Sequence, residues 1–122
     1  MRRVRWDEVK DLVSGSPYVG GLCESGLNLT WPLANLYIST DRLVVEPRCG
    51  LARLIHPWDF ERNEVAYVGA RSPGSLMKES VWIATDAYTR LEFWTWSARE
   101  IVDRLRDLGY PCRPHQGPGS IP

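Results

Sequence analysis

The sequence has few of the residues that build metal centres and disulfide frameworks. Its 122 residues include only two histidines and three cysteines. The cysteines Cys23, Cys49 and Cys112 are odd in number and have no CxxC spacing, which disfavours both a disulfide framework and a zinc site. We therefore expect free thiols, and neither a metal nor a cofactor.

Net charge and long apolar runs are also absent. The charges of the 15 basic and 15 acidic residues cancel. The overall electrostatic field of the protein therefore does not favour nucleic acid or an anionic membrane as the main partner. No apolar stretch approaches the ~20 residues of a membrane span. The basic start MRRVR is not followed by the apolar segment of a signal peptide. These absences predict a cytoplasmic protein without an integral membrane segment.

Catalytic motifs are missing as well. His56 and His115 have no partner at a spacing typical of metal ligands, and no nucleophile elbow or phosphate loop occurs between a strand and a helix. The sequence therefore predicts no catalytic, cofactor-binding or metal-binding residue. A non-enzymatic protein is the expectation, and an undetected enzyme is the less favoured alternative.

The residues that are present predict one mainly β domain. The clearest hairpin is NLYISTDRLVVEP, with strands at about 34–39 and 42–46 around a turn at Thr40 and Asp41. Further strands are expected at LNLTW, ARLIH, EVAYVGA, SVWIAT and RLEFWTW, the last two forming a hairpin. Glycines at 20, 21 and 26 indicate a loop, and PWDFERN indicates a turn. About seven short strands favour a barrel or a sandwich.

Helical patterns lie at both ends of the chain. WDEVKDLV places Trp6, Val9, Leu12 and Val13 on one stripe of a short helix within residues 1–14. The second helix is predicted from Ser97, with Glu100 completing a capping box. Its apolar stripe consists of Ile101, Val102, Leu105 and Leu108. Gly109 and Tyr110 then provide a C-terminal cap.

The order of these elements resembles that of a known family. NLYISTDRLVVEP, the later IHPWDF, a final strand pair and the closing SAREIVDRLRDLGYP are similar to bacterial pleckstrin-homology-like domains close to the GRAM type. The resemblance covers residues 27–110, and residues 111–122 are expected to be a flexible tail. It implies a seven-stranded antiparallel PH-like barrel, capped by a C-terminal helix and preceded by a short N-terminal helix.

The resemblance also implies a binding function. Domains of this superfold bind lipid headgroups, peptides or partner proteins, and they are not known for catalysis. Phosphoinositide-binding members carry a basic cluster between the first two strands, whereas the corresponding WPLAN of this chain has no Lys or Arg. Arg48, Arg53, Arg71 and Lys78 are interspersed with glutamates, as is typical of a solvated surface. We expect a protein-interaction module, with a peripheral lipid-binding domain as the alternative.

Tryptophans of the last hairpin form the candidate interaction surface. Alternation along RLEFWTW and SVWIAT places Leu91, Phe93, Val81 and Ile83 inward. It places Trp82, Trp94 and Trp96 outward. Trp96 precedes the Ser97 cap at the spacing of a hydrophobic staple with Ile101.

Trp82 and Trp94 have no such local partner, and exposed patches of that size are uncommon on monomers. The sequence leaves two possibilities for what covers these tryptophans. One is the N-terminal helix, and the other is another molecule such as a second copy, a protein partner or a membrane surface.

Overall fold

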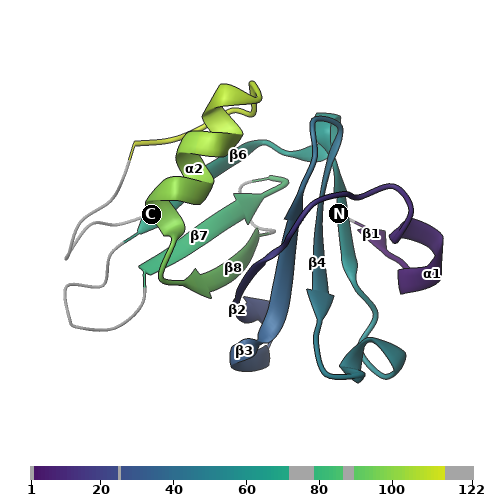
Figure 1. The fold of residues 1–122 in the computed structure, drawn as a ribbon. Helices are drawn as coiled ribbons and strands as arrows, with labels where there is room; N and C mark the ends of the chain where they lie inside the picture. Colours follow the sequence, from purple (N-terminus) through teal and green to yellow (C-terminus); the bar gives the residue numbers. More distant parts are fainter. Residues whose placement is uncertain (1, 25, 72–78, 87–89, 115–122) are drawn as a thin grey trace.

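The computed structural model describes residues 2–24, 26–71, 79–86 and 90–114. The fold of these residues is mainly β with a closing helix, as the sequence predicted (Figure 1). The strands are β1 (Arg2–Arg3), β2 (Tyr18–Glu24), β3 (Leu27–Ile38), β4 (Arg42–Pro47), β5 (Trp58–Glu61), β6 (Tyr67–Arg71), β7 (Glu79–Ala84) and β8 (Arg90–Thr95). The helices are α1 (Trp6–Val9), the 3-10 turns η1 (Leu51–Arg53) and η2 (Arg62–Glu64), and α2 (Ala98–Asp107).

The strands form one antiparallel sheet in the order β1-β5-β4-β3-β2-β8-β7-β6. β2 joins its two halves, because it pairs with β3 on one side and with β8 on the other. The pairing of β2 with β3 shifts register between Gly20 and Leu22, and such irregularities bend and twist a strand. Over the described residues, the sheet has eight strands and its outer strands do not pair with each other. The predicted count of seven is therefore wrong.

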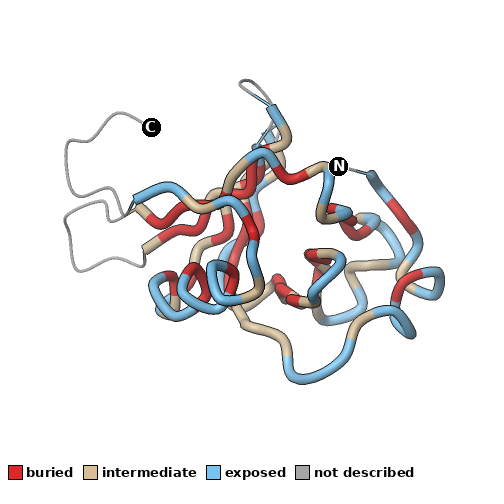
Figure 2. The backbone as a smooth tube through the Cα atoms, turned by 90° about the horizontal axis from the view of Figure 1, so that it is seen from above, coloured by how far each residue is buried: buried red, intermediate tan, exposed pale blue. Residues whose placement is uncertain are grey.

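Two predicted hairpins are confirmed by the strand register. Ile38 of β3 faces Leu43 of β4, and Ile83 of β7 faces Leu91 of β8. The side chains predicted to point inward, Leu91, Phe93, Val81 and Ile83, have no exposed surface. Figure 2 shows that buried residues recur along the backbone of the sheet. Local alternation was sufficient to assign these positions, because side chains on a strand point to opposite faces in turn.

The C-terminal helix α2 covers the core beside β6 and β7, where Ile101, Val102 and Leu105 are buried. Its end is a Schellman motif: Gly109 has φ +90°, and the Tyr110 amide donates to the Leu105 carbonyl at 3.0 Å. The predicted capping box is not formed. The Ser97 side chain makes no capping hydrogen bond, because its backbone has φ −114° and ψ 27°, outside the extended geometry usual at an N-cap. The Ser97 amide instead donates to Thr95 Oγ1.

Four segments differ from the prediction. Gly20 and Gly21, expected in a loop, lie in strand β2, where a Cβ at Gly20 would meet the Trp94 carbonyl and one at Gly21 would meet the Leu29 carbonyl; Gly26 lies in the turn after β2. PWDFERN contains strand β5, whose Trp58 and Phe60 are buried. ARLIH is no strand, and η1 occupies its start. WPLAN, taken as a loop between strands, lies within β3.

The N-terminal segment covers the outward side of β3 and β4. Helix α1 ends at Val9, earlier than the predicted stripe requires, and Leu12 is exposed. Val9 and Val4 are buried against Val44, and the Trp6 ring lies 5.3 Å from the Tyr37 ring. Helices α1 and α2 lie on opposite sides of the molecule in both ribbon and tube views (Figures 1 and 2). The N-terminal helix therefore does not cover Trp82 and Trp94, so the first of the two possibilities raised by the sequence is wrong.

Short terminal segments lie along β5 and β6, which are the outer strands of the part of the sheet formed by β2 to β8. At one edge, Arg2 and Arg3 of β1 pair with Asp59 and Trp58 of β5. At the other edge, residues 111–113 run parallel to β6: the Val68 amide donates to the Pro111 carbonyl, and the Arg113 amide donates to the Val68 carbonyl, each at 2.8 Å.

Candidate functional site

The candidate site lies on the outward side of β6, β7 and β8. Its side chains are Tyr67, Arg71, Trp82, Arg90, Glu92 and Trp94, joined by Arg113 from the segment after α2; we call this set the Trp82 face. Register places Trp82 opposite Glu92 and Trp94 opposite Ser80. The structure therefore brings two of the three predicted tryptophans, Trp82 and Trp94, onto one face of the sheet. Both are half-buried.

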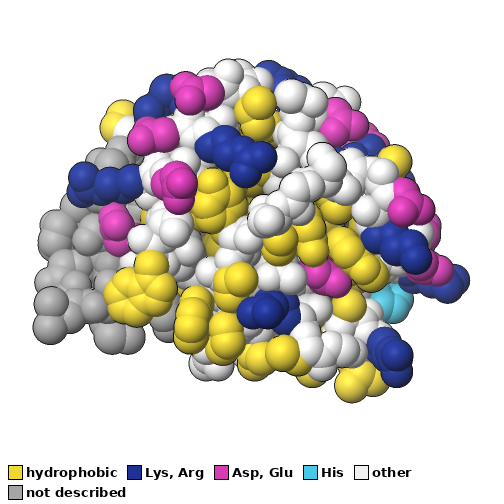
Figure 3. All heavy atoms as spheres, in the orientation of Figure 1, with side chains coloured by type: hydrophobic (Ala, Val, Ile, Leu, Met, Phe, Trp, Pro, Cys, Tyr) yellow, Lys and Arg dark blue, Asp and Glu magenta, His cyan; other side chains and the backbone are white. Residues whose placement is uncertain are grey.

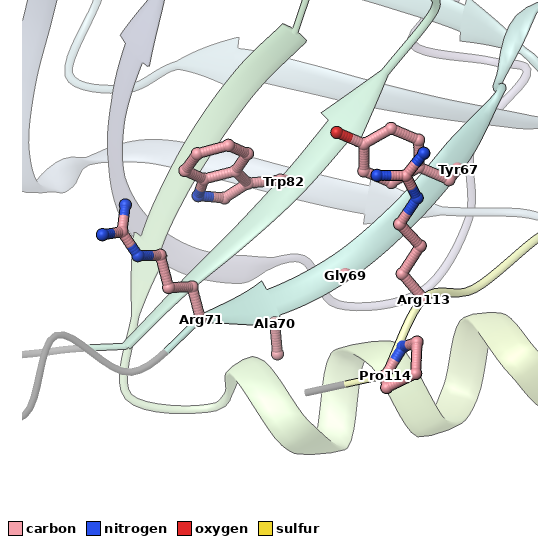
Figure 4. Close-up of a pocket in the computed structure, with 7 residues that line it drawn as sticks. All are labelled: Tyr67, Gly69, Ala70, Arg71, Trp82, Arg113 and Pro114. Atoms are coloured by element: carbon pink, nitrogen blue, oxygen red, sulfur yellow. The ribbon is translucent and has the colours of Figure 1, made fainter. Parts of the chain in front are cut away.

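Arginine side chains stack on the aromatic rings of this face. The Arg90 guanidinium lies 4.0 Å from the centroid of the Trp82 ring, and that of Arg71 lies 5.6 Å from it. The Arg113 guanidinium lies 3.7 Å from the Tyr67 ring. Figure 4 shows Arg113 against Tyr67 and Arg71 beside Trp82, while Ala70 points toward α2. Stacking of this kind fixes the guanidinium plane and stabilises the charge through the ring quadrupole.

Hydrogen bonds hold the Trp82 indole in place. Its Nε1–H donates to Glu92 Oε2 at 2.6 Å and to Ser80 Oγ at 3.1 Å, and the Ser80 hydroxyl also donates to Glu92 at 3.0 Å. The carboxylate of Glu92 is thus engaged by neutral donors. This arrangement orients the ring so that it supports the two arginines.

Trp96 lies beyond the end of β8 and is 62% exposed. Ile101, its predicted staple partner, has no exposed surface. Most of the indole therefore remains available for other contacts. Trp31 of β3 is also exposed, and Figure 3 shows hydrophobic side chains along the lower edge of the view, where β3 bends and β8 ends.

The hollow in the Trp82 face is shallow. Lined by Tyr67, Arg71, Trp82, Arg113 and their neighbours, it encloses only about 10 Å³. Pockets for small organic ligands are much larger, roughly 300–1,000 Å³. The face is therefore better suited to a flat partner surface or an extended chain than to an enclosed small molecule.

A larger hollow, about 500 Å³, lies between α1 and the β4–β5 connection and includes Glu46 and His56. Three of its polar side chains already have partners. Arg5 pairs with Asp7 at 2.9 Å, and Glu46 accepts hydrogen bonds from Asn35 and Tyr37. Burial and the neighbouring Glu46 raise the pKa of Tyr37.

Sequence reasoning missed several residues of the Trp82 face. The sequence places Arg71 among the charges of a solvated surface, and it gives no local indication of a role for Tyr67, Arg90 or Arg113. The alternation that placed Trp94 outward also places Arg90 outward. The pairing of β6 with β7 and the return of residue 113 to β6 are long-range, and no local pattern indicates them.

The remaining sequence candidates contribute little to this site. Cys23, Cys49 and Cys112 are free thiols, and burial raises the pKa of Cys112. His56 is exposed, while His115 and Lys78 lie outside the described residues. Among the residues that the structure describes, no cluster of His, Cys, Asp and Glu could hold a metal ion. No described helix is long and apolar enough to cross a membrane.

Comparisons with protein-family models and with curated proteins gave no match to this chain.

Proposed function

We propose that this chain is a PH-like domain that acts as a non-enzymatic interaction module, and that the Trp82 face with the adjoining Trp96 is its partner-binding surface. Support for the fold comes from strands β2 to β8. They are antiparallel, the first pairs with the last, and α2 packs beside β6 and β7. These are features expected from the resemblance.

The observation that carries the proposal is a difference between two parts of the outward side of the sheet. The N-terminal segment buries Val44 on the outward side of β4. Among the described residues, the outward side of β7 and β8 has no equivalent apolar cover, and Trp82 and Trp94 remain half-exposed beside an exposed Trp96. Tryptophan and arginine are the residue types that most often dominate binding energy at protein interfaces.

The test replaces exposed apolar side chains inside and outside this surface. Trp96→Ser should abolish capture of the partner from the native organism, because aromatic anchors carry a large share of interface energy. Its unfolding free energy should change by less than about 1 kcal/mol, as for other exposed positions. Affinity capture and thermal melting measure the two effects.

Leu54→Ser is the matched control. Leu54 is 84% exposed and follows η1, in the β4–β5 connection. This variant should retain the partner that the wild type captures. Equal capture of the partner by the wild type, Trp96→Ser and Leu54→Ser would refute the proposed surface.

A further inference from the structure

We infer that the Trp82 face binds a carboxylate-rich, extended segment of a partner protein through Arg71, Arg90 and Arg113. This inference rests on the proposed function, because it assigns a partner chemistry to the same surface.

Charge on the face is the first argument. Within the described residues, Arg71, Arg90 and Arg113 stack on aromatic rings and form no ion pair with a carboxylate. Other arginines have partners of two kinds. Arg2 and Arg42 pair with Asp59 and Arg106 pairs with Asp103, whereas Arg3 and Arg62 lie over rings and donate to backbone carbonyls. Arg104 lies over Tyr18 in the same way as the arginines of this face lie over their rings, but among the described residues it stands alone. The face therefore holds cations whose strongest complement is an external anion.

The distribution of acidic residues locates the cationic part more closely. Glu92 and Glu24 line a hollow on the β2 side of Trp82, next to Arg90. The hollow on the other side is lined by Arg71 and Arg113 and by no acidic residue. The positive excess thus lies over β6, at Arg71 and Arg113, whereas Arg90 lies on the side of Trp82 that also carries Glu24 and Glu92.

Geometry favours carboxylates on an extended chain. A guanidinium that is stacked on a ring keeps its N–H edge free for two parallel hydrogen bonds to one carboxylate. Stacking also restricts the side chain before binding, which lowers the entropic cost of recognition. Alternate side chains of an extended segment are about 7 Å apart and lie on one side, so two or three carboxylates could reach neighbouring arginines on a shallow face.

The same arrangement disfavours a membrane surface as the occupant. Membrane-binding segments insert exposed apolar groups into the interface. Trp82 is half-buried, with an arginine on each side and its indole N–H bound to Glu92. It is a platform for charged groups rather than an insertion residue.

The experiment titrates the full chain with an oligoglutamate peptide and monitors the Trp82 indole N–H and backbone amides by NMR. We expect saturable shifts of the Trp82 indole and of amides in β6, β7 and β8. An oligoglutamine peptide of equal length should give none. Arg71→Gln should weaken binding about tenfold, corresponding to one strong charge-assisted interaction. Arg71→Lys should not restore it fully, because lysine lacks the planar fork.

Arg106→Gln is the matched control, since Arg106 is an exposed arginine on α2 whose partner is Asp103. It should bind oligoglutamate as the wild type does. A well-dispersed spectrum for each variant shows that folding is retained.

Several outcomes would overturn the inference. Equal shifts with oligoglutamine would show that charge is not recognised. Shifts with phosphatidylserine vesicles but not with oligoglutamate would assign the face to lipid. No response to either probe, together with loss of the captured partner in Trp96→Ser, would reject the carboxylate partner and leave the proposed function standing. Capture that Trp96→Ser leaves unchanged would instead reject the proposed function.

Discussion

Asp59 illustrates how one charged side chain holds two elements together. It is fully buried on β5, and its Oδ2 accepts hydrogen bonds from Arg42 at 2.9 Å and from Arg2 at 3.1 Å. Arg42 is itself largely buried, so its charge depends on this carboxylate. The pair joins β4 to β5 and attaches β1 to the sheet edge.

Removal of the Asp59 carboxylate should lower the stability of the protein substantially. Asp59→Ala is expected to lower the free energy of unfolding by about 3–5 kcal/mol, because it leaves a largely buried guanidinium with only the longer ion pair to the exposed Asp41, at 3.7 Å. Asp103→Ala removes an exposed carboxylate that pairs with Arg106 and should cost less than about 1 kcal/mol. Denaturant unfolding of both variants measures the difference. Similar losses in the two would show that Arg42 finds compensating solvent or another partner.

Sequence reasoning succeeded at single residues where the cause is local. Strand alternation correctly assigned Phe93 and Ile83 to the core and Trp94 to the outside. It could not identify Asp59 as buried, because its segment PWDFERN looks like a turn and its burial depends on residues far along the chain. A polar residue becomes part of a core only through partners that local patterns do not specify.

At the element scale, the end of α2 is joined to the β3–β4 turn. The Tyr110 hydroxyl donates to the Ser39 carbonyl at 2.7 Å. Arg62 donates to the carbonyls of Thr40 at 2.6 Å and Leu108 at 2.7 Å, and its guanidinium lies over the Tyr110 ring. These contacts explain why a helix of ten residues is fixed at this end of the sheet.

This junction predicts a specific loss of stability at alkaline pH. Burial raises the pKa of Tyr110 to about 12, against a usual value near 10. Between these values the unfolded phenol is ionised and the folded phenol is neutral, so stability falls as pH rises through this window. Urea unfolding of Tyr110→Phe should lack that part of the fall, on the order of 1–2 kcal/mol. Tyr37 is present in both proteins, so a fall of equal size in both would contradict the role of Tyr110.

Elements were predictable from sequence where the hydrophobic pattern is strong. The stripe and C-terminal cap of α2 and the hairpins β3–β4 and β7–β8 are confirmed. β2 was missed because Gly20 and Gly21, typical of loops, are required here by the close approach of β8 and β3. Glycine is thus typical of turns but is also required where strands approach closely, and only the tertiary arrangement distinguishes these two roles.

For the whole molecule, the short terminal segments determine which surfaces of the sheet are covered. The sequence predicted that an N-terminal helix would need a surface, and it does pack on one, although on β3 and β4 rather than beside Trp94. Which face receives it depends on the path of residues 10–17. The predicted stripe ends at Val13 and residues 14–17 have no periodic signal, so the choice between the two faces could not be made from sequence.

The placement of these segments along β5 and β6 has a consequence for self-association. Unpaired strand edges are templates on which further chains add by backbone hydrogen bonding. Here β1 lies along β5, and residues 111–113 lie along β6. A chain that ends at Tyr110 should therefore remain folded but form concentration-dependent oligomers through β6, which light scattering would detect. A truncated chain that stayed monomeric at high concentration would show that β6 resists edge pairing without residues 111–113. If the truncated chain does form oligomers, the residues beside β6 protect the protein against aggregation, and a fusion tag should be designed to leave them in place.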